Sequence, residues 1–252
     1  MSESASPPMS TPLPETDPPV RGNRETLRET LAPLGGRQVA DIGCGDGTWT
    51  RFLTREGARV VGMDPNPVQM DSARAAERAG DETYMVAGAE ALPLTNGSQD
   101  IALFFNSLHH VPPDLMTAAV SEAVRVVRPG GLVVAFEPVA RGANYDLNRP
   151  LDDEAEIRDQ AHRSLHAATE GDAPLTLDRE FEYITRARKG DFEAWRDVMV
   201  RINPERAVHF EARPEDLRAH FERILTGQPR DAEGFALLDQ PMRVTVLRRP
   251  SS

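Results

Sequence analysis

An apolar stretch that breaks into alternating glycines constrains the fold of this chain more than any other feature. Residues 38–42 have the sequence QVADI, and Gly43, Gly45 and Gly47 follow directly. An apolar run bounded by glycines is typical of a buried parallel strand. Glycines at alternate positions let the backbone approach a ligand where a Cβ would clash. A helix expected over residues 48–55 would direct its free N–H groups at the same place, so the sequence predicts a nucleotide-binding strand, loop and helix.

The spacing of these glycines separates two kinds of nucleotide site. The dinucleotide fingerprint is G-x-G-x-x-G, whereas this chain has G-x-G-x-G with Thr48 in the sixth position and no lysine of a phosphate-binding loop. An acidic residue, Asp41, precedes the first glycine by two positions. A nicotinamide oxidoreductase is therefore disfavoured but stays an alternative. A catalytically silent cofactor-binding or scaffold protein is a second alternative, because its loop could have the same residues.

Expected strands and helices alternate after the loop. We expect strands over residues 58–64, 83–87, 100–106 and 132–136, separated by helices over residues 48–55, 67–79 and 113–127. Such alternation implies right-handed crossovers and a parallel sheet. The fold class predicted from the sequence is therefore α/β, with a doubly wound, mostly parallel sheet.

Asp64 ends the second expected strand, about twenty residues after the first glycine, where a carboxylate can accept both hydroxyls of a ribose. The alternative is a loop or helix-capping acid, since Asp64-Pro65-Asn66-Pro67 also has the pattern of a helix start. Together with the glycine loop, the position favours the ribose.

Five motifs then follow in a characteristic order. They are D-x-G-x-G-x-G at residues 41–47, G-A-E-A-L-P at 88–93, L-H-H-V at 108–111, R-V-V-R-P-G-G at 125–131 and Glu137-Pro138 after the fifth expected strand. This order resembles class I S-adenosylmethionine-dependent methyltransferases. The branch it is most similar to includes ubiquinone/menaquinone-biosynthesis C-methyltransferases and many small-molecule methyltransferases. The resemblance covers about residues 36–138 and implies a seven-stranded Rossmann-like methyltransferase sheet.

The resemblance implies S-adenosyl-L-methionine as cofactor and a small molecule as methyl acceptor. It implies that Asp41 holds the loop and the amino group of the cofactor's methionine part, although Asp41 could also only brace the loop. Cys44 lies within the loop, and its thiol is expected to be a small packing group. The residues expected to bind the cofactor are Asp41, Gly43, Cys44, Gly45, Gly47, Asp64, Pro65, Ala89, Glu90 and Asn106. Ala89 and Glu90 would reach the adenine, and Asn106 the methionine part.

Three residues are candidates for proton chemistry on the acceptor. His109 and His110 titrate near neutral pH, so either could accept a proton from an acceptor group. One of them could instead brace the loop, because L-H-H-V is a feature of the resemblance. Glu137 ends the fifth expected strand at the sheet edge where ligands bind in open α/β sheets. No residue pattern indicates a metal site.

The remaining chain divides by composition. Residues 1–22 are rich in proline and are expected to form a disordered tail. Residues 23–138 form the cofactor-binding core, and residues 139–233 a helical insertion after the fifth strand that covers the site and carries substrate choice. Within it, helices are expected over residues 152–169, 178–202 and 214–225. Residues 234–252 are expected to form a strand pair that completes the sheet.

Charge and cysteine content exclude several classes of function. The formal net charge is -11, which disfavours nucleic acid as the main partner, because phosphate binding needs a basic surface. Cys44 is the only cysteine, so an intrachain disulfide and a cysteine-rich metal site are both excluded. No signal peptide or membrane span is visible, and a cytoplasmic protein is expected. Oligomeric state does not follow from these features.

Overall fold

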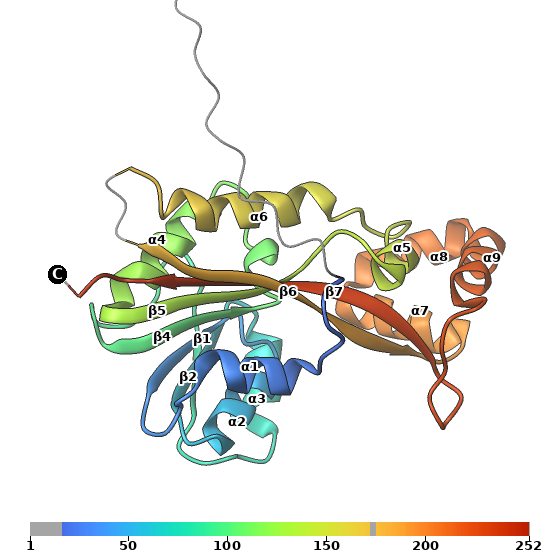
Figure 1. Ribbon diagram of the computed structural model, residues 1–252. Helices are drawn as coiled ribbons and strands as arrows, with labels where there is room; N and C mark the ends of the chain where they lie inside the picture. The colour runs from blue at the N-terminus through green and yellow to red at the C-terminus, as the bar shows by residue number, and fades with distance from the viewer. Residues whose placement is uncertain (1–16, 172–174, 252) are drawn as a thin grey trace, which may run out of the picture.

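Seven strands form one sheet in the part of the chain that this computed structural model describes, residues 17–171 and 175–251 (Figure 1). They are β1 (Gln38–Ile42), β2 (Arg59–Asp64), β3 (Thr83–Val86), β4 (Gln99–Phe105), β5 (Val127–Pro138), β6 (Thr176–Lys189) and β7 (Ala236–Arg248). The strand order is β3-β2-β1-β4-β5-β7-β6. Strands β1 to β5 pair in parallel, and β7 runs antiparallel to both neighbours. The predicted seven-stranded, mostly parallel α/β sheet is confirmed.

Helices cover both faces of the sheet (Figure 1). One face carries α1 (Asn23–Leu31), α2 (Thr48–Arg55) and α3 (Pro67–Ala75). The opposite face carries α4 (Met116–Val126) and α6 (Ala155–Ala167). No helix in the described ranges is both long enough and apolar enough to cross a membrane.

Strand β4 shows why the sheet has a core on each face. All seven of its residues are buried, and successive side chains point to opposite faces. Ile101 and Leu103 pack with α1 and α2, whereas Ala102 and Phe104 pack with α4 and α6. An uninterrupted apolar run is therefore what a central parallel strand requires.

A third apolar cluster lies apart from the sheet faces. It joins α5 (Ala143–Asn148), α7 (Phe192–Ile202), α8 (Ala207–Ala212), α9 (Pro214–Leu225) and the first residues of β7. Two short 3-10 turns complete the described helical elements, η1 (Leu108–His110) and η2 (Pro204–Arg206). Trp195 is central in this cluster, with ring centroids 5.2 Å from Phe210 and 5.4 Å from Phe221. Figure 1 shows these helices grouped where β5 leads into α5.

The helices predicted over residues 178–202 are wrong in their first half. Residues up to Lys189 form β6, which pairs along its length with β7, so the predicted helical insertion is divided by a strand. The predicted strand pair at 234–247 is instead the single strand β7. Acidic residues at alternate positions are consistent with a strand, because Asp178, Glu180 and Glu182 then share one face. On that face Asp178 binds Arg248, Glu180 binds His162, and Glu182 binds Arg243.

The last residues of the predicted tail are ordered against the sheet. Residues 1–16 lie outside the described part of the chain. Val20 bridges to Ile184, and the Ile184 N–H donates to the Pro19 carbonyl at 2.9 Å. Because β6 is an edge strand, these bonds satisfy backbone groups that would otherwise be open to pairing with another chain. The predicted boundary at residue 22 is therefore too late.

Shortening Phe221 to alanine should destabilise the third apolar cluster. Phe221 is 4% exposed and stacks on Trp195, so Phe221→Ala should lower the free energy of unfolding by about 3–5 kcal/mol. Urea unfolding should be followed by Trp195 fluorescence in a Trp49→Phe background, since the chain has two tryptophans. Phe235→Ala, at a 39% exposed position, is the control and should cost about 1 kcal/mol or less. Equal effects of both variants would show that the cluster is not a packed core.

Candidate active site

A cavity of about 570 Å³ opens at the carboxyl ends of β1, β2 and β4. The order of the strands reverses between β1 and β4, and ligands of open α/β sheets bind at such a switch point. The residues that line it are Ile42, Gly43, Gly45, Asp64, Pro65, Asn66, Gln69, Gly88, Ala89, Glu90, Phe104, Asn106, Ser107, His110, Val111, Pro112, Leu115 and Ile202. Seven of the ten residues predicted to bind the cofactor are in this wall, and Asp41, Cys44 and Gly47 are not.

Gly43 and Gly45 are glycines for different reasons. A Cβ on Gly43 would lie 2.6 Å from the Cβ of Ser107, so this glycine lets the turn after β4 pack against the loop. A Cβ on Gly45 would meet no described protein atom within 4 Å, although Gly45 lies in the cavity wall. Gly45 therefore leaves space that the protein itself does not fill.

Asp41 is buried beneath the loop rather than in the cavity wall. Its Oδ2 accepts a hydrogen bond from the Thr50 hydroxyl at 2.6 Å, and its Oδ1 has no partner among the described residues. Burial, with a smaller contribution from the nearby charge of Asp64, raises the pKa of Asp41 to about 6 against the opposing effect of the Thr50 hydrogen bond. An unpaired buried carboxylate oxygen is costly, so a cationic group or a hydrogen-bond donor there would be favourable.

Cys44 and Gly47 support the loop from outside the cavity. Burial raises the pKa of the Cys44 thiol far above its ordinary value, with Asp41 and Asp64 adding to the effect, so it is a packing group as expected. Gly47 precedes α2 in a left-handed conformation, and a Cβ there would lie 2.7 Å from the ring of Tyr84.

Asp64 links the glycine loop to the start of α3. One carboxylate oxygen accepts the Gly45 N–H at 3.0 Å, and the other accepts the Asn66 N–H at 2.9 Å. Asn66 in turn caps α3 through the Val68 N–H. Each carboxylate oxygen of Asp64 keeps a free lone pair toward the cavity that Asp64 and Pro65 line, as a ribose diol requires.

The turn after β3 places Glu90 over Gly88. A Cβ on Gly88 would lie 2.7 Å from the carboxyl carbon of Glu90, so this glycine makes room for the acid at the cavity wall.

Asn106, at the end of β4, has a positive φ of 55°. Its N–H donates to the Phe136 carbonyl at 2.7 Å, which fixes the turn that leads to the histidines.

Glu137 organises that turn. Its Oε1 accepts the N–H groups of Ser107 at 3.1 Å and Leu108 at 2.9 Å, and its Oε2 binds Nδ1 of His109 closely. Burial alone would raise the pKa of Glu137, but His109 and the two N–H groups hold it below its ordinary value. Glu137 is therefore a buried, ionised side chain that links β5 to η1 through hydrogen bonds.

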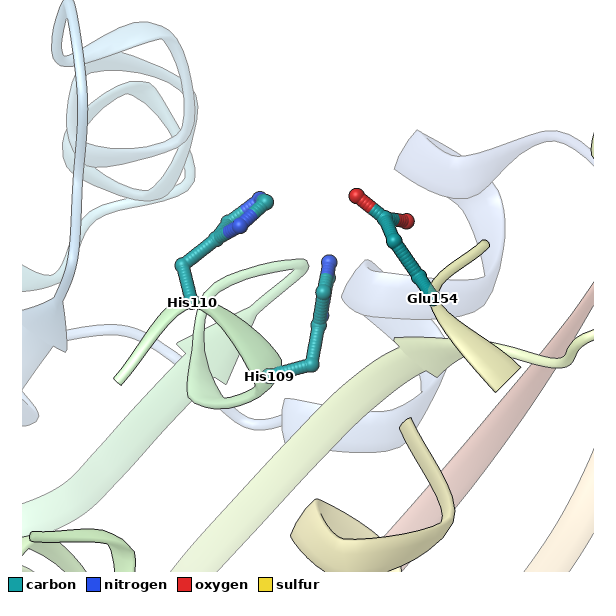
Figure 2. A group of neighbouring side chains, drawn as sticks. All are labelled: His109, His110 and Glu154. Carbon is teal, nitrogen blue, oxygen red and sulfur yellow. The ribbon is translucent and has the colours of Figure 1, made fainter. Parts of the chain in front are cut away.

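The two predicted histidines have different surroundings. His109 is buried with Glu137, whereas His110 is exposed and lines the cavity. Their ring centroids lie 4.0 Å apart. Figure 2 shows both rings converging with Glu154, whose carboxylate also binds Arg158. Partial desolvation at the cavity wall and the neighbouring His109 lower the pKa of His110, so His110 is neutral near pH 7.

Several site residues were not identified in the sequence. Ser107 donates to the Ile42 carbonyl at 2.6 Å and joins β1 to the turn after β4. Ile202 ends α7 and reaches the cavity wall from far along the chain, and Glu154 comes from the residue before α6. Only Asn66 had a usable signal, its capping position before Pro67.

Comparison with known proteins shows that part of this chain is similar to methyltransferases. Residues 40–135 match the family model described as a methyltransferase domain. An uncharacterized methyltransferase of Mycobacterium sp. (strain KMS) is 40% identical over 100 residues, which are 40% of this chain and 38% of the relative. An uncharacterized methyltransferase of Synechocystis sp. is 34% identical over 123 residues, 49% of this chain and 57% of the relative. The alignment thus spans about two fifths of the mycobacterial relative.

Solved structures share the fold over more of the chain. A Bacillus halodurans protein described provisionally as a methyltransferase has a TM-score of 0.60 at 18% identity, covering 90% of this chain and 99% of that one. The cyclase SpnF has a TM-score of 0.58 at 20% identity, covering 91% and 80% respectively. The chain therefore has the predicted Rossmann-like fold of these methyltransferase structures, and its residues 40–135 match a methyltransferase domain. The resemblance to the quinone-biosynthesis branch stays a prediction.

Replacing Asp41 by asparagine should change the dependence of stability on pH. The folded pKa of about 6 lies above the value near 3.9 of an unfolded aspartate, so the folded state binds the proton more tightly. Stability should therefore fall as pH rises from about 4 to 6 and then level off, by on the order of 3 kcal/mol. Asp41→Asn should remove this fall, as measured by urea unfolding at several pH values. An unchanged pH profile would contradict a buried, ionisable Asp41.

Proposed function

We propose that this protein transfers the methyl group of S-adenosyl-L-methionine to a small molecule. The observation that carries the proposal is the space beside Gly45, where the cavity wall lacks a side chain and no described protein atom comes within 4 Å. The cavity volume of about 570 Å³ is within the range of small-molecule sites. When bound, S-adenosyl-L-methionine supplies an electrophilic methyl group on its sulfonium.

The residues around the cavity fit the parts of this cofactor. The free lone pairs of Asp64 suit the ribose hydroxyls, and Ala89 and Glu90 line the wall where the resemblance implies the adenine. The unpaired Oδ1 of Asp41 suits a positively charged or donating group near the loop. Each contact uses a group whose hydrogen-bonding capacity the protein leaves unfilled.

The acceptor side of the cavity supports a small, partly apolar substrate. Val111, Pro112, Leu115 and Ile202 line it, and Ile202 belongs to the helices after β5. These helices lie where β5 leads into α5 (Figure 1), and Ile202 brings α7 to the cavity wall, so they could decide which acceptor enters. The main work of the protein would be to align the acceptor and exclude water.

His110 is the side chain best suited to take a proton from the acceptor. It lines the cavity and is neutral near pH 7, because partial desolvation at the cavity wall and the neighbouring His109 lower its pKa. His109 and Glu137 would hold it in position rather than touch the acceptor, since both are buried behind it. A hydroxyl or carbon acid acceptor would need such a base, and a thiolate or carboxylate acceptor would not.

Binding and turnover experiments separate this proposal from its alternatives. Thermal unfolding should shift upward with S-adenosylhomocysteine and not with NAD, and stabilisation by NAD alone would favour an oxidoreductase. Incubation with S-adenosyl-L-methionine and a panel of small acceptors should release S-adenosylhomocysteine, with a matching methyl gain by mass spectrometry. Binding without turnover across the panel would favour a silent or scaffold role. Turnover has to be measured as well as binding, because a protein described as a cyclase shares this fold, which is therefore not confined to methyltransferases.

Gly45→Ala and Gly36→Ala form a matched pair that tests the cofactor site. Both glycines have positive φ, 54° and 74°, and a Cβ on either would meet no described atom within 4 Å. Each variant should lose about 1–2 kcal/mol of stability from backbone strain. Only Gly45→Ala should weaken S-adenosylhomocysteine binding in calorimetry, by about tenfold or more, because only Gly45 lines the cavity. Equal affinities of the two variants for S-adenosylhomocysteine would show that the cofactor does not bind beside Gly45.

His110→Gln tests the proposed base once an acceptor is known. For a hydroxyl or carbon acid acceptor, kcat should fall by about 100-fold or more, with S-adenosylhomocysteine affinity little changed. The wild-type kcat should decline at acidic pH as His110 becomes protonated, and this limb should vanish in the variant. His209→Gln, in the separate helix α8, is the control. An unaltered kcat in His110→Gln would exclude this histidine as the base without excluding methyl transfer.

A further inference from the structure

A second histidine and carboxylate cluster lies away from the cofactor cavity. His162 and His166 lie on α6, and Glu180 lies on β6. The Nε2 atoms of both histidines are 3.0 Å from the same oxygen, Oε2 of Glu180. The Thr245 hydroxyl of β7 donates to that oxygen at 2.8 Å. The consecutive elements α6 and β6 and the more distant strand β7 therefore converge on one carboxylate.

The helix spacing makes this convergence possible. Residues four apart on a helix lie on one face, so His162 and His166 present their rings side by side, with centroids 4.4 Å apart. Glu180 faces them because alternate residues of β6 share one side of the strand. The three side chains are partly buried, with 19%, 23% and 13% exposed, so an ion in solution can reach them.

The distances suit a tetrahedral metal ion. Bonds of about 2.0–2.2 Å to imidazole nitrogen and carboxylate oxygen put neighbouring ligand atoms about 3.3 Å apart. The two measured N–O distances of 3.0 Å differ from that by a few tenths of an ångström, which small side-chain rotations supply. The Thr245 hydroxyl already orients the Glu180 carboxylate by a hydrogen bond, as residues that contact metal ligands commonly do.

The charges around the cluster also favour a cation. Among the described residues, the groups that hydrogen-bond the Glu180 carboxylate are His162, His166 and Thr245, with no arginine among them. The guanidinium of Arg243, on the neighbouring strand β7, is bound to Glu182.

The cluster of His109, His110 and Glu154 is a weaker candidate for a metal site. There the Glu154 carboxylate binds Arg158 at 2.5 Å, and Arg206 lies 3.7 Å from its other oxygen. A dication would have to displace these arginines or lie beside their positive charge. His109 also already uses Nδ1 to bind Glu137. The two clusters thus differ in the charge that surrounds the carboxylate.

We propose that His162, His166 and Glu180 bind a divalent transition-metal ion, with zinc as the best match. Two imidazoles and one carboxylate are ligands that zinc accepts, and a fourth position stays open to water. The residue after His162 is Arg163, so the H-E-x-x-H pattern of zinc peptidases is missing. The ion joins α6 to the edge strand β6, and α6 packs on the η1 turn that carries His109 and His110.

Zinc binding to the full chain tests the proposal. After removal of metal by a chelator, calorimetry with Zn²⁺ should give one site, and thermal unfolding should shift upward with Zn²⁺ concentration. His162→Gln, His166→Gln and Glu180→Gln should each weaken binding by more than about tenfold, whereas His209→Gln should not. No binding by the wild-type chain, or unchanged binding in all three variants, would overturn the site.

Chemical protection of the wild-type chain locates the ion without relying on the variants. Diethylpyrocarbonate modification, mapped by mass spectrometry, should be slowed by Zn²⁺ at His162 and His166 and unchanged at His209 and His220. Protection at His109 and His110 instead would place the ion in the other cluster and contradict the proposal. These readouts do not depend on methyl transfer, so they are independent of the proposed enzyme activity.

Discussion

The close approach of Gly43 to Ser107 is the constraint on which the site depends. These residues follow β1 and β4, the two strands between which the sheet order reverses. A Cβ on Gly43 would lie 2.6 Å from that of Ser107, and the Ser107 hydroxyl bonds the Ile42 carbonyl at 2.6 Å. This contact fixes the glycine loop against the turn that carries the histidines. The glycine loop and that turn both form part of the cavity wall.

Buried carboxylates connect this centre to the rest of the molecule. Glu137 ties β5 to the η1 turn, Glu180 ties β6 to α6, and Glu182 joins β6 to Arg243 of β7. Each accepts several hydrogen bonds, as a buried charge must. The helices around the cavity are therefore held by polar contacts between strands and helices as well as by apolar packing.

Local patterns predicted the core of the fold but not its later part. The strand and glycine loop at residues 38–47, the acid at Asp64 and the turn at Glu90 were identifiable because each depends on neighbours in the sequence. The helix predicted over β6 is wrong because the acids at 178, 180 and 182 follow the two-residue period of a strand. Their partners on α6 and β7 are distant in sequence, so no local window contains the pairing.

The sequence by itself determined the α/β class and the strand, glycine loop and helix at residues 38–55, because these follow from backbone requirements and local periodicity. Only the tertiary structure decided which histidine faces the cavity, since His109 and His110 are adjacent and differ only in whether Glu137 binds them. The same holds for Ile202 at the cavity wall and for Glu180 beside His162 and His166. Such contacts join residues far apart in the chain, and their distances are set by how helices pack on the sheet.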